Sequence, residues 1–105
     1  MPNTFRFDDS GKTLHVPAGD EIQVQLEETP TTGYRWQVAG IDDGVLSPQG
    51  SSFSPGTAIG AAGMRTFVFR AERPGTATLN LRLQRPWEDE KSSLKNFQVT
   101  IIVDK

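Results

Sequence analysis

The chain of 105 residues has the length of one ordinary domain, and we expect residues 1–105 to fold as a single domain. Its composition is 35% hydrophobic and 23% charged, with 10 glycines, 7 prolines and no cysteine, which excludes a disulfide framework and argues against a disordered chain. Eleven Lys and Arg oppose 13 Asp and Glu, and the net charge of −2 argues against a nucleic-acid-binding surface or an anchor to anionic membranes.

Hydrophobic and polar residues alternate along most of the chain, which is the pattern of half-buried antiparallel strands. In chain order, the predicted strands cover residues 5–7, 14–16, 22–26, 34–38, 51–53, 67–71, 77–83 and 97–103. The alternation is clear at residues 22–26 and in the last three segments, and weaker in the other four. The acidic doublets at residues 8–9, 27–28 and 42–43 are predicted to lie on the solvated surface.

Turn residues separate these segments at intervals typical of a β-sandwich. Clusters of Gly, Pro, Asp and Ser occur at residues 10–11, 17–20, 42–44 and 73–75. No segment has a sustained helical stripe with a capping signal. The sequence therefore predicts an all-β protein, an immunoglobulin-like antiparallel β-sandwich of seven or eight strands, although an open barrel would give much the same pattern.

The chain lacks the residue sets that a hydrolase or a metal site needs. Its single histidine is His15, predicted to lie on the polar face of a strand, and it has no cysteine. One histidine without cysteine excludes the usual zinc sites. The acidic run at residues 88–90 lacks the spacing of a calcium-binding loop. We expect no catalytic residue, no metal and no cofactor.

Signals for membrane insertion and export are missing from the sequence. No apolar run approaches the roughly 20 residues that a membrane-spanning helix needs. Residues 1–4 lack the charged head and apolar stretch of a signal peptide. We expect no membrane partner and no nucleic-acid partner, and the localisation stays open. A trimmed upstream signal would make the protein periplasmic or secreted.

Three segments are more elaborate than the turns of a sandwich require. The first, loop 1, consists of Thr29, Pro30, Thr31, Thr32, Gly33 and Tyr34. The second is the long stretch from Ser47 to Arg65, which ends in loop 2, consisting of Ile59, Gly60, Ala61, Ala62, Gly63 and Met64. The third, loop 3, consists of Arg85, Pro86 and Trp87.

Each loop has a distinct chemistry. In loop 1, Pro30 fixes φ at about −65° and Gly33 permits a left-handed backbone, so this loop is predicted to be rigid. The small residues of loop 2 allow another backbone to approach closely, and Ile59 and Met64 offer apolar side chains. In loop 3, Trp87 is costly to expose unless a partner covers it.

These three segments, in this order and over nearly the whole chain, resemble the chagasin-like inhibitors of papain-type cysteine peptidases. The family's first loop reads Asn-Pro-Thr-Thr-Gly followed by an aromatic residue, and loop 1 departs from it at Thr29. The second reads Gly-x-Gly-Gly, and loop 2 departs from it at Ala62. The third reads Arg-Pro-Trp, which loop 3 matches in full. Each motif alone is weak, whereas three in register are specific.

The resemblance implies that the three loops gather at one end of the sandwich and enter the active-site cleft of the peptidase together. Thr31 and Thr32 would lie over the catalytic Cys and His, with Thr31 nearest the thiol. Loop 2 would line the non-primed side of the cleft. Trp87 would pack on the primed side, with Arg85 bonded near it. The resemblance thus implies a reversible, tight-binding, monomeric inhibitor of papain-like cysteine peptidases of the papain and cathepsin L type.

The residues by themselves leave two questions open. Trp87 could cap the core of the sandwich instead of meeting a partner, whereas Trp36 alternates with neighbouring apolar residues and is predicted to lie in the core. The alternative function is an immunoglobulin-like adhesion or ligand-binding module, in which Trp87 and Tyr34 would contact a sugar or a partner protein.

Overall fold

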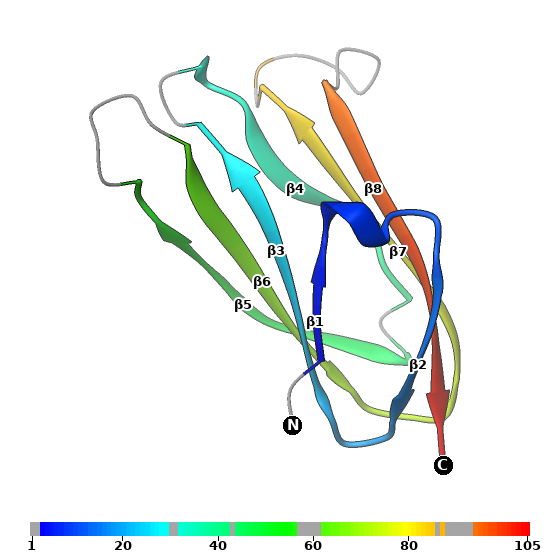
Figure 1. Cartoon of the computed structure of the whole chain (residues 1–105). Coiled ribbons are helices and arrows are strands. Elements are labelled where there is room, and N and C mark those ends of the chain that lie inside the picture. The colour runs from blue at the N-terminus through cyan, green and yellow to red at the C-terminus, as the bar shows by residue number, and fades with distance from the viewer. Residues whose placement is uncertain (1–2, 30–31, 43, 57–61, 86, 88–93) are drawn as a thin grey trace.

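Two four-stranded sheets pack face to face in the computed structural model, which describes residues 3–29, 32–42, 44–56, 62–85, 87 and 94–105 (Figure 1). The strands are β1 (Asn3–Arg6), β2 (Thr13–Pro17), β3 (Glu21–Glu28), β4 (Arg35–Gly40), β5 (Leu46–Ser54), β6 (Gly63–Ala71), β7 (Gly75–Gln84) and β8 (Lys95–Asp104). A 3₁₀ turn, η1 (Phe7–Asp9), follows β1. Within these ranges, no helix has the length and apolar character needed to cross a membrane.

The strand order is β1-β3-β6-β5 in one sheet and β2-β8-β7-β4 in the other. The predicted immunoglobulin-like β-sandwich is confirmed. Within it, β1 pairs with β3 and β2 pairs with β8 in parallel, where the sequence predicted antiparallel strands. The chain crosses from one sheet to the other through η1, so that β1 and β2 lie at the edges of different sheets. Alternation indicates which face of a strand is buried and carries no information about strand direction.

The inward faces of the two sheets form the hydrophobic core. Ile22, Val24 and Leu26 are at most 1% exposed, as the alternation in this segment predicted. Trp36 on β4 is 5% exposed, which confirms its predicted place in the core. The prediction for His15 is also confirmed, because its side chain is 62% exposed and lies 3.4 Å from the Asp104 carboxylate.

The stretch from Ser47 to Arg65 was predicted to be a long loop with a short strand, and this is wrong. β5 covers nine residues, from Leu46 to Ser54, and β6 begins at Gly63, so Gly63 and Met64 belong to a strand. Among the described strands, β5 is an edge strand that pairs with β6 alone, and Leu46 is its one buried residue. Because most of the other residues of β5 are exposed, its sequence has no hydrophobic alternation.

Candidate functional site

The strands that flank loops 1, 2 and 3 meet these loops at the same end of the sandwich, whereas β1 begins and β8 ends at the other end (Figure 1). Strand pairing produces this arrangement. In the first sheet Glu28 before loop 1 pairs with Gly63 after the β5–β6 connection. In the second sheet Arg35 after loop 1 pairs with Gln84 before loop 3. The predicted site residues that lie outside the described ranges are Pro30, Thr31, Ile59, Gly60, Ala61 and Pro86.

Thr32 closes loop 1 with short-range hydrogen bonds. Its backbone N–H and its Oγ1 hydroxyl both donate to the Thr29 carbonyl, at 3.2 and 2.7 Å. The same Oγ1 accepts a hydrogen bond from the Tyr34 backbone N–H at 3.3 Å. Gly33 between them has φ of +79°, the left-handed conformation that favours glycine. The described part of loop 1 is therefore closed by local hydrogen bonds and is not an extended strand.

Loop 3 contacts loop 1 through Arg85 and Trp87. The Arg85 Nε donates to the Thr32 carbonyl at 3.2 Å, and the guanidinium lies 4.5 Å from the centroid of the Tyr34 ring. One edge of the Trp87 ring lies against Gly33, where an added Cβ would stand 3.0 Å from Trp87 Cη2. The structure thus brings together five residues of the two loops that the sequence singled out.

Trp87 is 73% exposed, which settles the question of its environment. It does not cap the core, because its indole lies on the outside of loop 1 with one edge against Gly33. A large exposed aromatic side chain at a loop end is typical of a binding surface. Arg85, which precedes it by two residues, is half-buried.

Loop 2 is described only at its C-terminal part. Ala62 is exposed, Gly63 is buried and Met64 is half-buried. A Cβ at Gly63 would overlap the Phe53 ring and the Ser54 carbonyl oxygen, so glycine is required here by the close approach of β5 and β6. Met64, the last residue of loop 2, lies on β6 and lines a hollow on the side of the sandwich.

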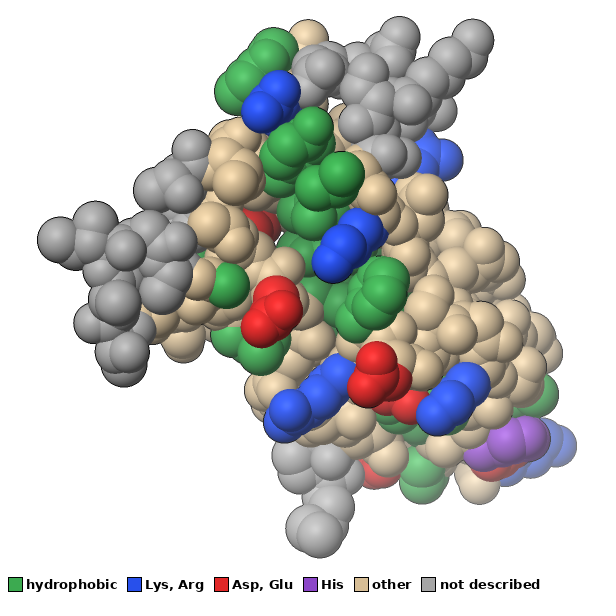
Figure 2. Space-filling view, turned by 45° about the horizontal axis from the view of Figure 1, so that its top comes forward, with side chains coloured by type: hydrophobic (Ala, Val, Ile, Leu, Met, Phe, Trp, Pro, Cys, Tyr) green, Lys and Arg blue, Asp and Glu red, His purple; other side chains and the backbone are tan. Residues whose placement is uncertain are grey.

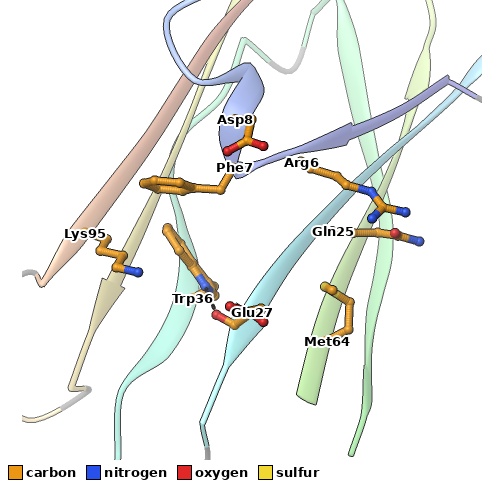
Figure 3. A pocket seen from close by; sticks show the side chains of 8 residues that line it. All are labelled: Arg6, Phe7, Asp8, Gln25, Glu27, Trp36, Met64 and Lys95. Carbon is orange, nitrogen blue, oxygen red and sulfur yellow. Dashed lines mark hydrogen bonds between the residues drawn. The ribbon is translucent and has the colours of Figure 1, made fainter. Parts of the chain in front are cut away.

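That hollow has a volume of about 310 Å³ and is lined by residues from both sheets (Figure 3). The side chains that line it are Arg6, Phe7, Asp8, Gln25, Glu27, Trp36, Met64 and Lys95. Phe7 and Trp36 form its aromatic part, with ring centroids 6.3 Å apart, and the Lys95 ammonium lies 5.4 Å from the centroid of the Phe7 ring. In the space-filling view, hydrophobic side chains form a strip on this face, with Lys or Arg side chains beside it (Figure 2).

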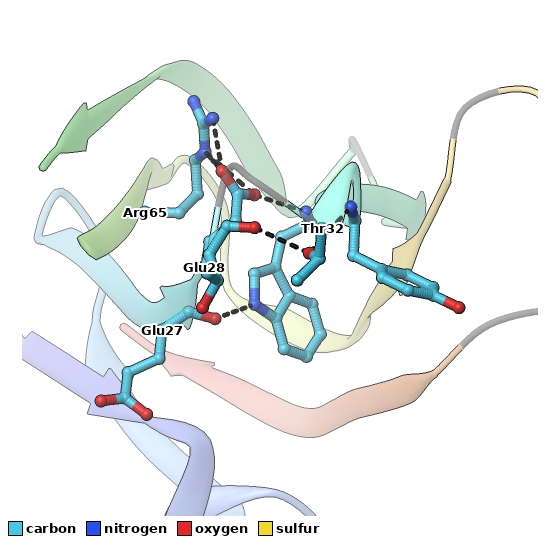
Figure 4. Close-up of polar contacts among 7 residues, drawn as sticks. Glu27, Glu28, Thr32 and Arg65 are labelled. Atoms are coloured by element: carbon cyan, nitrogen blue, oxygen red, sulfur yellow. Dashed lines mark hydrogen bonds and ion pairs between the residues drawn. The ribbon is translucent and has the colours of Figure 1, made fainter. Parts of the chain in front are cut away.

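Glu28 is buried, so the prediction that the acidic doublet at residues 27–28 lies on the solvated surface is wrong for this residue. Its side chain is only 2% exposed and its carboxylate lies 2.7 Å from Arg65 Nη2 (Figure 4). Oε1 also accepts a hydrogen bond from the Trp36 backbone N–H at 2.8 Å. The position of Glu28, two residues after Leu26 on an alternating strand, was the signal that it faces inward.

Trp36 joins the two sheets at the loop end. Its backbone N–H donates to Glu28, and its indole Nε1 donates to the Glu27 carbonyl at 2.8 Å (Figure 4). Both acceptors belong to β3, which lies in the other sheet. These bonds link the strand before loop 1 to the strand after it.

The described ranges contain no group of three or more His, Cys, Asp or Glu side chains that could hold a metal ion. The side chains that converge at the loop end are instead aromatic, hydroxyl and guanidinium groups, held by hydrogen bonds and one ion pair. This arrangement can present a rigid surface to another molecule.

Two curated relatives are similar to the chain over most of its length. Amoebiasin-2 of Entamoeba histolytica is 29% identical over 94 residues, which cover 87% of this chain and 76% of the relative. Chagasin of Trypanosoma cruzi is 29% identical over 96 residues, which cover 86% of this chain and 87% of the relative.

Solved structures share the fold. The cysteine protease inhibitor EhICP2 from Entamoeba histolytica has a TM-score of 0.87 at 24% identity, with 98% of this chain and 96% of that chain covered. PbICP-C, solved in complex with falcipain-2, has a TM-score of 0.76 at 13% identity, with 97% and 99% covered. Residues 15–101 match the model of the chagasin family peptidase inhibitor I42. Because this match spans most of the 105 residues, the chain belongs to the chagasin family of peptidase inhibitors.

Proposed function

We propose that the protein is a reversible, tight-binding inhibitor of papain-like cysteine peptidases, whose active-site cleft it blocks with loops 1, 2 and 3. Membership of a peptidase-inhibitor family supports this function over the alternative of an adhesion or ligand-binding module. The proposal assigns no catalytic role to any residue of this chain. The single histidine, His15, is exposed on β2, and its imidazole lies beside the Asp104 carboxylate.

The observation that carries the proposal is the exposed Trp87 ring held against loop 1. A protein that binds a cleft needs a large apolar anchor that is already ordered in the unbound state, because ordering on binding lowers affinity. Trp87 meets both conditions, since it is 73% exposed and lies against Gly33. Arg85 also connects loop 3 to loop 1, because its Nε donates a hydrogen bond to the Thr32 carbonyl.

An inhibitor must also resist cleavage by the peptidase that it blocks. A nucleophilic thiol attacks a carbonyl that is held roughly 3 to 3.5 Å away in an aligned, extended segment. The Thr32 carbonyl accepts a hydrogen bond from Arg85, and the Thr32 N–H and hydroxyl are bonded to Thr29. These bonds oppose the extension of loop 1 into a substrate-like strand, so we expect the inhibitor to stay uncut.

The test is titration of the protein into papain and into cathepsin L while hydrolysis of a fluorogenic peptide is followed. We expect complete inhibition, full recovery of activity on dilution, and an intact inhibitor by mass spectrometry. A serine peptidase such as trypsin serves as the control and is expected to stay active. Undiminished hydrolysis by both cysteine peptidases at micromolar inhibitor would refute the proposal.

A second measurement asks whether the loops occupy the catalytic centre. Papain whose catalytic Cys carries a bulky alkyl group is expected to bind the inhibitor far more weakly than the free enzyme, because the adduct fills the space that loop 1 requires. Equal binding to both forms of papain would place the contact outside the cleft. Cleavage within loop 1 would replace the proposal with a slow-substrate mechanism.

A further inference from the structure

We infer that Glu28 and Arg65 are positioning residues that hold loops 1 and 2 in the geometry required for inhibition. This inference rests on the proposed function and deepens it, because it concerns residues that lie beneath the loops and outside the surface that meets the peptidase. Glu28 is the last residue of β3, directly before loop 1, and Arg65 is the third residue of β6, directly after loop 2.

The two side chains form a closely bonded ion pair at the end of the core. Arg65 Nη2 donates to Glu28 Oε2 at 2.7 Å, and Arg65 Nε lies 3.2 and 3.4 Å from the two carboxylate oxygens (Figure 4). The Glu28 side chain is 2% exposed and that of Arg65 is 22% exposed. Water therefore hardly reaches the carboxylate, and its charge is compensated inside the protein.

The pair touches both flanks of loop 1. Glu28 itself precedes the loop, and its Oε1 accepts the backbone N–H of Trp36, the second residue of the strand that follows the loop. The Trp36 indole adds a second bond in the same direction, to the Glu27 carbonyl. The distance between the two ends of loop 1 is thus set by bonds that converge on residues 27 and 28.

The pair also touches both flanks of the β5–β6 connection that contains loop 2. Arg65 follows the connection on β6, and its guanidinium lies 5.1 Å from the centroid of the Phe53 ring on β5. Gly63, two residues before Arg65, is pressed against the same Phe53 ring. Through Arg65, the strands on either side of loop 2 are therefore joined to the carboxylate that holds loop 1.

Such a network keeps two loops in a fixed relation before the peptidase is met. Both charges are needed, because a buried carboxylate without Arg65 or a guanidinium without Glu28 would draw water into the end of the core and separate the strands. Looser loops lose more conformational freedom on binding and bend more easily into an extended, cleavable shape. Affinity and resistance to cleavage are both expected to depend on the pair.

The experiment compares Glu28→Gln and Arg65→Lys with the wild-type chain. Glu28→Gln keeps an acceptor for Trp36 and removes the charge, whereas Arg65→Lys keeps the charge and removes the planar, two-nitrogen contact. For papain we expect each variant to have an inhibition constant raised by about tenfold, since ordering even two more side chains on binding has an effect of this size. We also expect each to be cut in loop 1 or loop 2 during prolonged incubation with papain.

Matched controls separate positioning from a general loss of stability. Ile22 is fully buried near the start of β3, whereas Glu28 is at the end of this strand. Ile22→Val is expected to lower the melting temperature slightly and Ile22→Ala to lower it more, and both changes lie far from the loops. These controls are expected to inhibit papain like the wild type and to stay uncut below their melting temperatures. Arg65→Lys keeps the test decisive if Glu28→Gln does not fold.

The outcomes distinguish this inference from the proposed function. If the wild-type chain does not inhibit papain or cathepsin L, the proposed function itself is wrong. If the wild type inhibits, and the pair variants match an Ile22 variant of equal melting temperature in both inhibition constant and resistance to cleavage, the positioning role is overturned. Weaker inhibition together with cleavage, in the pair variants only, supports it.

Discussion

Replacement of Trp87 by alanine tests whether this side chain is the anchor of the binding surface. A tryptophan side chain buries about 200 Å² when fully covered. Trp87 is 73% exposed, so about 150 Å² remains for a partner to cover. At about 25 cal/mol per Å², covering this area contributes roughly 3.7 kcal/mol to binding.

Two effects modify this figure. Ordering a side chain on binding costs about 0.5 to 1.5 kcal/mol, and part of that cost is avoided because Trp87 already lies against Gly33. We therefore expect Trp87→Ala to weaken peptidase binding by about 2 to 4 kcal/mol, which is a rise of about 30- to 1,000-fold in the inhibition constant. The melting temperature should hardly change, because the ring contributes little to the core.

The assay is competitive inhibition of papain with a fluorogenic substrate, combined with thermal unfolding followed by circular dichroism. Val38→Ala is the matched control, because Val38 is also an exposed apolar residue, 39% accessible, but lies on β4 and outside the three loops. We expect Val38→Ala to leave the inhibition constant unchanged. An unchanged inhibition constant for Trp87→Ala, or a large fall in its melting temperature, would refute the reasoning.

Three further predictions concern backbone fit and charge. Gly33→Ala should raise the inhibition constant for papain by about tenfold and lower the stability by about 1 kcal/mol, because the methyl group strains a φ of +79° and meets the Trp87 ring. Gly63→Ala should lower the free energy of unfolding in urea by about 1 to 3 kcal/mol, because its Cβ overlaps Phe53. The Arg6 backbone N–H, and then Lys12, hold the pKa of Asp9 below its usual value. The stabilisation is therefore present at neutral pH and lost as pH falls through the lowered pKa. Asp9→Asn should melt earlier than the wild type at about pH 7, and this difference in melting temperature should narrow as the pH falls below the usual range of Asp pKa values.

Hydrophobic alternation predicted the strands that face the core on one side. β3, β7 and β8 alternate along their length, and the structure buries the predicted residues, such as Leu79, Leu81 and Ile101. Hydrophobic alternation does not predict β5. Most residues of this edge strand are exposed to solvent, so the strand does not need an apolar residue at every second position. Pro48 and Gly50 within β5 are of residue types that weaken a strand, and in the structure they flank an irregularity in the pairing with β6.

The candidate site was predictable as a set of loop motifs and unpredictable as a set of contacts. The motifs of loops 1 and 3 stand out in the sequence because of Gly33 and Trp87. The hydrogen bond from Arg85 to the Thr32 carbonyl joins residues 53 positions apart, and no spacing rule connects them. The ion pair of Glu28 with Arg65 joins residues 37 positions apart. Because Glu28 follows another glutamate, the pair was interpreted as a surface doublet, although Glu28 continues the inward face of β3.

The polar group at the loop end of the core follows from the topology of the two sheets. Among the described strands, β4 pairs with β7 alone, so some of its backbone N–H groups have no partner in those strands. The described pairing of β1 with β3 ends at Gln25, so the last part of β3 is not flanked by β1. Trp36 fills this uncovered corner, and its two N–H groups need acceptors there because burial without a partner is costly.

An apolar residue at position 28 would add volume without an acceptor, whereas the Glu28 carboxylate accepts the Trp36 backbone N–H and Arg65 balances its charge. The end of the core is therefore closed by residues of the strands themselves, and Trp87 need not cover it and can remain exposed for a partner.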